Sequence, residues 1–326
     1  MTHGLVTIFG GSGFIGRYAT KALIDAGFSV RIAVRTPENA QDMIRAYEQG
    51  SVETVEADIR DSASVDAALT GSDAVINLVG ILYEEAGQTF SAAQLDGSVN
   101  VAKAAAKNGI GRFVQMSAIG AQEGGKAAYA HTKGKADRLV KETLPQAVIL
   151  RPSIVFGPED DFFNRFAELA SSPVSTIAPF LPAIGGGNTL LQPVYVGDVA
   201  DAIVAALKRD DARGQTYELG GPQQYSFKDL YCFISQQIER KRYPLTLPFF
   251  VAKPMGAVLN AVWKAPFLPM WKLFGPPPIT GDQVEMLKTD NVVSESALTL
   301  ADLGIDTATS IEMIVPDYLS RFRPQI

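Results

Sequence analysis

The sequence has 326 residues, an apolar content of 47% and a formal net charge of −6. This length suggests about two domains or one large α/β unit with a sizeable core, and the negative charge disfavours a nucleic-acid partner. The single cysteine, Cys232, excludes an internal disulfide framework and fits a reducing compartment, and we expect it to be a buried helix residue.

The first predicted elements are a strand over residues 5–10 and a helix over 14–26, joined by a glycine-rich loop that contains Gly10, Gly13 and Gly16. Glycines at the end of a strand let the backbone turn sharply and approach a pyrophosphate closely. The free N–H groups and dipole of the following helix then hold the negative charge. The motif in this context predicts dinucleotide binding.

The second predicted strand, 28–35, ends at Arg35, where an Asp or Glu that binds the ribose 2′-OH of NAD is often found. Arg17 follows the third glycine of the loop. Two guanidinium groups near this ribose suit a 2′-phosphate, because arginine binds phosphate bidentately. The sequence therefore favours NADP(H), unless either arginine is simply a solvated surface residue.

Further strands are predicted at 51–57, 73–80, 111–117 and 147–155, with helices at 37–49, 61–70, 91–108 and 128–143 between them. Strands separated by helices predict an α/β fold, a Rossmann-type doubly wound parallel sheet with helices on both faces. Asp58 follows the third strand. It is placed either to accept a hydrogen bond from an adenine amino group or to cap the next helix beside Asp61.

Tyr129 and Lys133 lie four residues apart on the predicted helix 128–143, so they share one face. A nearby ammonium group lowers the pKa of a tyrosine and can hold a nicotinamide ribose, which would make the tyrosine a usable acid or base. The sequence has two histidines, His3 and His131, and no cluster with metal-ligand spacing, so we expect no metal site.

After residue 155 proline and glycine become frequent, and a strand and helix return at 190–208. We interpret 1–155, with 190–208, as the NADP(H)-binding domain. Residues 156–326 are interpreted as a smaller, irregular C-terminal lobe.

Residues 240–281 of this lobe carry six cations and no acidic residue, together with both tryptophans and eight prolines. The uncharged runs are too short for a membrane-spanning helix. The composition favours contact with an anionic membrane surface or a membrane subunit; the alternative is a domain core whose lysines extend to solvent.

The motifs together resemble the extended short-chain dehydrogenase/reductases over roughly residues 4–221. The similar positions are the three loop glycines, Asp58, Asn77, Asn100, Tyr129 with Lys133, Leu150-Arg151-Pro152 and residues 193–199. In that family a serine or threonine assists the tyrosine; here Ser117 lies near that place, whereas Ala118 occupies the usual hydroxyl position in one alignment. The candidate cofactor-binding residues are Gly10, Gly13, Phe14, Ile15, Gly16, Arg17, Arg35, Asp58, Ile59, Leu78, Val79, Gly80, Ser117, Tyr129, Lys133 and Pro152. Tyr129 and Lys133 are the catalytic candidates if the protein is an enzyme.

The segment 279–293 and the Pro- and Trp-rich segment before it resemble the dinucleotide-binding accessory subunits of respiratory complex I. This resemblance implies a subunit with structurally bound NADP(H), near the membrane and the quinone-entry region and without established turnover. It implies partners among the other complex I subunits and a peripheral location on the cytoplasmic face of a bacterial inner membrane, or on the matrix face in an organelle. The alternative function is a soluble NADP-dependent sugar-nucleotide epimerase or reductase.

Overall fold

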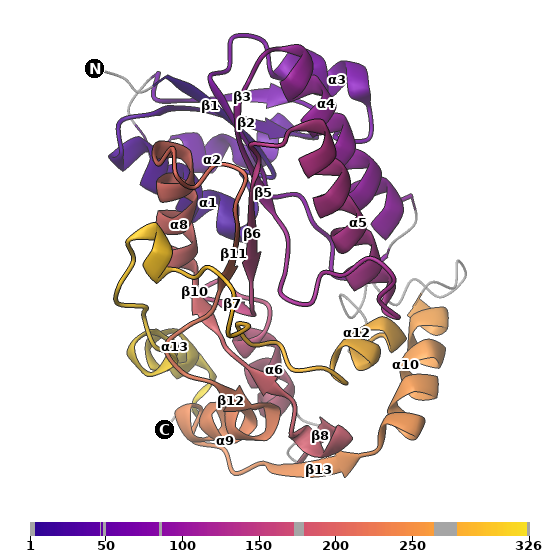
Figure 1. Ribbon diagram of the computed structural model, residues 1–326. Helices are drawn as coiled ribbons and strands as arrows, with labels where there is room; N and C mark the ends of the chain where they lie inside the picture. Colours follow the sequence, from indigo (N-terminus) through magenta and orange to yellow (C-terminus); the bar gives the residue numbers. More distant parts are fainter. Residues whose placement is uncertain are drawn as a thin grey trace.

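The fold is organised around one seven-stranded sheet, as the sequence predicts (Figure 1). The computed structural model describes residues 4–45, 47, 50–84, 87–172, 179–263 and 279–324. The strand order is β11-β6-β5-β4-β1-β2-β3, and all neighbouring strands pair in parallel. The strands are β1 Leu5–Phe9, β2 Ser29–Val34, β3 Val52–Glu56, β4 Ala74–Asn77, β5 Arg112–Met116, β6 Val148–Pro152 and β11 Thr216–Leu219.

Helices cover both faces of this sheet. On one face α1 (Phe14–Asp25) packs against α8 (Val196–Lys208), and their apolar side chains share a core with β1 and β2. On the other face α3 (Ser62–Ala68), α4 (Gly97–Lys107) and α5 (Ala128–Thr143) pack side by side over a second core. Because both faces are buried, the central strands are almost entirely apolar.

The strand order reverses direction between β1 and β4, so their connections leave the sheet on opposite sides. A crevice forms outside the carboxyl ends of the strands at such a point, and ligands of open α/β sheets bind there. The glycine loop after β1 and residues 78–80 after β4 therefore come together, although they are far apart in the sequence.

Several elements differ from the sequence-based expectation. The predicted helix 37–49 is a 3-10 turn, Pro37–Ala40, followed by the short α2, Gln41–Ile44. The predicted helix 91–108 begins as a π-helix, η2 (Ser91–Asp96), before α4. The predicted strand 147–155 divides into β6 and β7 (Val155–Phe156), and β7 leaves the main sheet to pair with β10 (Val194–Tyr195).

Strand β11 was not predicted from the sequence, because four residues in a region rich in turns give too short a pattern. It lies beside β6 at the edge of the sheet, so the chain after residue 155 contributes β11 to the main sheet and α8 to the helices that cover it.

The remaining C-terminal elements lie below the sheet in Figure 1 and contain more helix than their composition indicates. They pack around a third, aromatic-rich core and a small fourth core. The helices are α6 Phe163–Ser171, α9 Phe227–Gln237, α10 Phe249–Trp263, α12 Gly281–Met286 and α13 Ile311–Leu319, with the 3-10 turns η3 Gly185–Gly187, η4 Ala301–Leu303 and η5 Ser320–Phe322. The short strands are β8 Phe180–Ile184, β9 Leu190–Leu191, β12 Tyr225–Ser226 and β13 Tyr243–Leu247.

The expectation that Cys232 is buried is wrong. It lies on α9 but is exposed, because Tyr231 and Ile234 occupy the inward-facing positions of that helix.

Candidate functional site

The glycine loop has the backbone geometry that close approach of a phosphate requires. Gly10 has a φ of +82°, in the left-handed region that favours glycine. A Cβ on Gly16 would lie 2.4 Å from the Gly10 carbonyl oxygen, so no other residue fits there. By contrast, a Cβ on Gly13 would meet one described atom within 4 Å, the same carbonyl oxygen at 3.3 Å. Gly13 is exposed, and its contact of 3.3 Å is tight but much less severe than the one at Gly16.

Helix α1 presents its N-terminus at this loop. Gly13 is its N-cap residue, and within the described part of the chain no side chain caps the helix or places an acidic group in its first turn. The first backbone N–H groups of a helix need partners, and its dipole favours an anion there. This uncapped end fits the pyrophosphate of a dinucleotide.

A cleft of about 550 Å³ extends from the glycine loop along the carboxyl ends of the strands. Its walls come from the loop after β1, the ends of β2 and β3, the segment after β4 and the start of η2. The lining residues are Gly10, Ser12, Gly13, Ala33, Val34, Arg35, Thr36, Ala57, Asp58, Ile59, Arg60, Leu78, Val79, Gly80, Ile81, Gln88 and Ala93.

The two predicted phosphate-binding arginines occupy different positions. Arg35 is exposed at the end of β2 and lines the cleft. Arg17 is also exposed, but its Nε donates a hydrogen bond to the Ser12 carbonyl oxygen at 3.2 Å, and it is not among the residues that line the cleft. Of the predicted pair, Arg35 is the one that lines the cleft.

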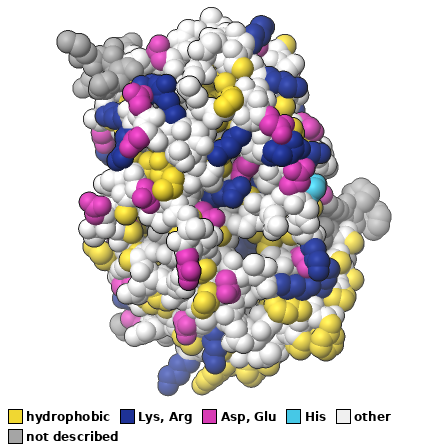
Figure 2. All heavy atoms as spheres, viewed as in Figure 1, with side chains coloured by type: hydrophobic (Ala, Val, Ile, Leu, Met, Phe, Trp, Pro, Cys, Tyr) yellow, Lys and Arg dark blue, Asp and Glu magenta, His cyan; other side chains and the backbone are white. Residues whose placement is uncertain are grey.

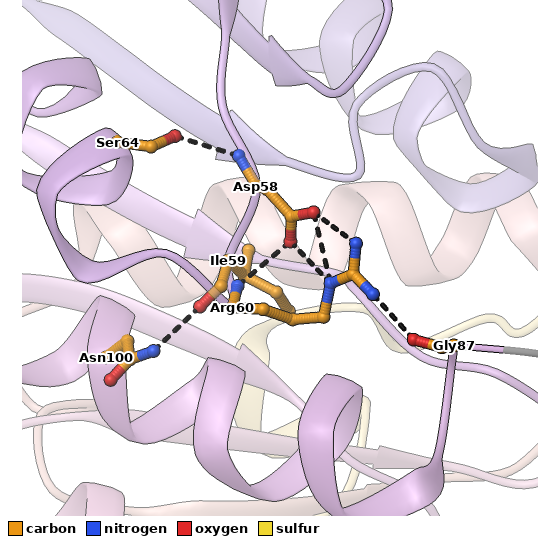
Figure 3. A network of polar contacts seen from close by, with 6 residues as sticks. All are labelled: Asp58, Ile59, Arg60, Ser64, Gly87 and Asn100. Atoms are coloured by element: carbon orange, nitrogen blue, oxygen red, sulfur yellow. Dashed lines mark hydrogen bonds and ion pairs between the residues drawn. The ribbon is translucent and has the colours of Figure 1, made fainter.

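Asp58 follows β3 and lines the cleft, and its carboxylate faces Arg60 (Figure 3). Asp61, by contrast, caps α3 by accepting a hydrogen bond from the Ala63 N–H at 3.0 Å. The capping alternative for Asp58 is therefore wrong. Its carboxylate pairs with Arg60, with the shortest contact, Nη2 to Oδ2, at 2.5 Å. Hydrogen bonds from Arg60 hold the pKa of Asp58 below its usual range, and the charge of Arg35 lowers it further. Sequence reasoning missed Arg60, which looks like an ordinary solvated charge.

Tyr129 and Lys133 lie on α5 and are not among the residues that line the cleft, although Lys133 lies beside Gly80, which does line it. Burial raises the pKa of Tyr129 to about 12, so its phenol stays protonated at neutral pH. Burial also lowers the pKa of Lys133 to about 8. The Lys133 Nζ donates a hydrogen bond to the Met116 carbonyl oxygen at 3.0 Å and lies 3.3 Å from where a Cβ on Gly80 would be. The predicted lowering of the tyrosine pKa by this lysine is therefore wrong, because desolvation dominates.

Ser117 is buried, and its side chain faces Asp137 on α5. Its hydroxyl donates a hydrogen bond to Asp137 Oδ2 at 2.8 Å, and Arg151 donates to the same oxygen at the same distance. This hydroxyl holds β5 to α5 and is not directed at Tyr129. The arrangement favours Ala118 as the residue at the usual hydroxyl position. Among the remaining candidates, Ile59 and Pro152 are buried, and Phe14 and Ile15 are half-buried at the start of α1.

Gln94, on the π-helix η2, is a second residue that sequence reasoning missed. It is fully buried, and neither its amide nitrogen nor its oxygen has a hydrogen-bond partner in the described structure. Its oxygen lies 4.0 Å, and the Lys133 Nζ 3.3 Å, from where a Cβ on Gly80 would be. π-helical turns often occur at functional sites.

A larger cavity, of about 870 Å³, lies at the opposite, N-terminal ends of the strands. The cations at its wall are engaged: Arg112 and Arg213 pair with Asp210, and Lys208 donates to the Ala26 carbonyl oxygen at 3.4 Å. Its position and chemistry make it a poor candidate for the ligand site.

The C-terminal segment expected to contact a membrane includes β13 and α10. Phe250, Val258 and Leu245 are 79%, 63% and 57% exposed, and Figure 2 shows apolar side chains along the edge of the molecule where α10 lies. Lys253 pairs with Glu285 at 2.7 Å, so this cation is already neutralised. Lys264, Lys272 and Trp271 lie outside the described residues. None of the described helices is both long and apolar enough to span a bilayer, and the described residues contain no metal-binding cluster of His, Cys, Asp or Glu.

Comparison with known proteins identifies the family. Residues 6–220 match the NAD dependent epimerase/dehydratase family. The chain is 36% identical over 306 residues to NADH dehydrogenase [ubiquinone] 1 alpha subcomplex subunit 9, mitochondrial, of Arabidopsis thaliana, which covers 92% of this chain and 74% of that protein. The subunit of the same name from Mus musculus is 31% identical, over 98% of this chain and 80% of that protein. The NADH-ubiquinone oxidoreductase 40 kDa subunit of Neurospora crassa is 29% identical, over 97% of this chain and 79% of that protein.

Solved structures share the fold at lower identity. The NADPH-dependent quinone oxidoreductase QOR2 of Escherichia coli, solved with NADPH, has a TM-score of 0.70 at 18% identity, over 97% of this chain and 99% of that one. The dTDP-glucose 4,6-dehydratase of Bacillus anthracis, solved with NAD, has a TM-score of 0.60 at 16% identity, over 75% of this chain and 84% of that one.

Proposed function

Because this chain belongs to the NAD dependent epimerase/dehydratase family, and within it to the group of mitochondrial NADH dehydrogenase subunits, we propose that it is an accessory subunit of respiratory complex I with a structurally bound NADP(H). The observation that carries this proposal is the similarity to these subunits along almost the whole chain, including the C-terminal part that extends beyond the family match.

The residues at the cleft fit the cofactor. The uncapped N-terminus of α1 and the exposed Gly13 that lines the cleft suit a pyrophosphate, and Arg35 suits a 2′-phosphate. Asp58 faces the adenosine end, and Lys133 lies near Gly80 at the other end, where it would hold the nicotinamide ribose. When bound, the nicotinamide supplies a hydride donor or acceptor.

The chemistry around Tyr129 favours a structural role for this cofactor. A tyrosine acts as a base when its pKa is brought near the working pH, whereas burial moves that of Tyr129 to about 12. The hydroxyl of Ser117, which would assist it in an enzyme, is bonded to Asp137. Both features argue against the alternative of a soluble sugar-nucleotide epimerase or reductase.

We further propose that the subunit lies at the membrane side of the complex, near the quinone-entry region and on the cytoplasmic or matrix face. The exposed apolar side chains of β13 and α10 support this placement, because such residues on a peripheral protein suit headgroup-depth contact or a partner subunit.

The test is affinity purification of the tagged chain from detergent-solubilised membranes of its source. We expect the other complex I subunits to co-purify and denaturation in a neutral organic solvent to release NADP(H). Recovery of the chain alone from the soluble fraction, with turnover of a nucleotide sugar, would instead support the enzyme alternative.

A further inference from the structure

We propose that Arg60 selects 2′-phosphorylated dinucleotides, by releasing Asp58 and binding the 2′-phosphate together with Arg35. This inference rests on the proposed NADP(H) function and assigns a specificity role to a residue that neither the motifs nor the family match singles out.

Arg60 occupies the adenosine end of the cleft and engages both oxygens of Asp58 (Figure 3). Its Nε donates to Oδ1 at 2.9 Å and to Oδ2 at 3.0 Å, its Nη2 donates to Oδ2 at 2.5 Å, and its backbone N–H donates to Oδ1 at 3.0 Å. An adenine amino group that bonds to Asp58 would compete with these donors. Binding of the adenosine therefore requires the guanidinium group to move.

The main chain at this turn is fixed, so the movement falls on the Arg60 side chain. The Ser64 hydroxyl accepts a hydrogen bond from the Asp58 N–H at 2.9 Å, and the Asn100 amide donates to the Ile59 carbonyl oxygen at 2.9 Å. The guanidinium is held on the other side by the Gly87 carbonyl oxygen, to which Nη1 donates at 2.6 Å. Arg60 thus joins the end of β3 to the loop that carries Gln88, across the cleft.

The charges around Asp58 indicate where the released Arg60 side chain would bind. Arg35 and Arg60 both line the cleft, and the charges of both act on Asp58, whereas Arg17 is not a lining residue. A phosphate dianion between the two guanidinium groups would accept charge-assisted hydrogen bonds from each. NAD carries a 2′-hydroxyl at this position. Because this group is uncharged, it cannot replace the ion pair between Asp58 and Arg60 that is broken. The pair between Asp58 and Arg60 therefore disfavours NAD, while a 2′-phosphate offsets its loss.

The experiment is isothermal calorimetry on the nucleotide-free full chain with four probes. NADPH and NADH report on the whole cofactor, and adenosine 2′,5′-bisphosphate and AMP isolate the 2′-phosphate. The variants are Arg60→Gln, which removes the charge, and Arg60→Lys, which keeps the charge without the planar fork. Arg209→Gln is the control, because Arg209 is a similarly exposed arginine that also pairs with an aspartate two residues away in sequence, Asp211. Thermal unfolding without ligand checks that each variant is folded.

We expect Arg60→Gln to weaken NADPH and the bisphosphate roughly ten- to hundredfold, the loss expected for one charge-assisted hydrogen-bonding group. NADH and AMP should bind as well as before or more tightly, Arg60→Lys should be intermediate, and Arg209→Gln should match the unmodified protein. A folded Arg60→Gln variant that keeps the full preference for the 2′-phosphate, or that weakens all four probes equally, overturns the assignment. If the unmodified protein shows no preference for NADPH over NADH, the proposed NADP(H) function itself is wrong. This result differs from one in which only the role of Arg60 is wrong.

Discussion

The carboxylate of Asp282 accepts a hydrogen bond from the backbone N–H of Tyr129 at 3.1 Å, although the two residues are 153 positions apart. It also accepts the N–H of Ala128 at 2.6 Å, so α12 supplies the N-terminal cap of α5. Helix α12 packs closely on α10, where a Cβ on Gly256 would lie 2.9 Å from the Gly281 nitrogen. The helix that carries Tyr129 and Lys133 is therefore joined to the exposed apolar surface through a single short helix.

Replacing Asp282 with asparagine should loosen this connection. Loss of a charged cap costs about 1 kcal/mol of stability. We expect faster hydrogen exchange in α12 and in the first turn of α5, and NADPH affinity reduced a few-fold. The control is Asp302→Asn, which removes a similar carboxylate contact to the Thr299 N–H on the surface. Equal behaviour of the two variants would show that Asp282 has no special role.

Lys133→Met should stabilise the nucleotide-free protein at pH 7 while weakening NADPH binding. Burial lowers the pKa of Lys133 to about 8, so below that pH the folded state carries a buried ammonium group at a cost of roughly 1–3 kcal/mol. Between about pH 8 and 10.5 the unfolded chain binds the proton and the folded chain does not, so stability from this group rises with pH. The difference in unfolding free energy between variant and wild type should therefore shrink from pH 7 to pH 9.5 in urea titrations. A constant difference would mean that the ammonium is not desolvated.

Tyr129→Phe should leave respiratory electron transfer unchanged, since the phenol stays protonated and its pKa is raised to about 12. The lost hydroxyl contributes at most one hydrogen bond to the cofactor, about 1 kcal/mol. NADH:quinone activity in membranes and the NADPH content of the purified complex are the measurements. A several-hundred-fold loss of an NADPH-dependent turnover would instead identify Tyr129 as a catalytic residue.

Phe250→Asp together with Val258→Asp should detach the isolated chain from anionic vesicles in a flotation assay. These side chains are 79% and 63% exposed on α10, so their replacement barely affects the core and places negative charge at the proposed contact. Met313→Asp is the matched control, because Met313 is 73% exposed on α13. If the wild-type protein does not float with the vesicles, the membrane contact is wrong. The exposed apolar surface of α10 would then have to contact a partner subunit, which co-purification tests.

The sequence predicts the sheet and the glycine loop well, because both depend on local patterns. Continuous apolar runs mark the buried parallel strands, and the spacing of Gly10, Gly13 and Gly16 reflects contacts within one turn. Strand β11 escapes prediction, since its four residues are held in place by β6 rather than by their own pattern.

The site is predicted less completely, because several of its contacts join distant segments. The Arg60 side chain is held by the Gly87 carbonyl oxygen, and Asp282 is held by the backbone N–H groups at the start of α5. The direction of the Ser117 hydroxyl depends on Asp137 and Arg151 and cannot be read from the motif. The binding of NADP(H) by the residues of the cleft stays a prediction.

The central claim, that a bound nucleotide supports this subunit within complex I, is tested most directly with Gly13→Val. A Cβ on exposed Gly13 would make one tight contact, 3.3 Å to the Gly10 carbonyl oxygen, so the loop would have to shift by a few tenths of an ångström, whereas the added side chain would occupy the place of the pyrophosphate. Membranes from cells that produce the wild-type or the variant chain are separated by blue-native electrophoresis, and the chain is detected with an antibody. We expect the wild-type chain to migrate with complex I and the variant to be depleted from it, because a ligand that binds the native state stabilises it. A variant that lacks nucleotide but assembles at the wild-type level would contradict the account.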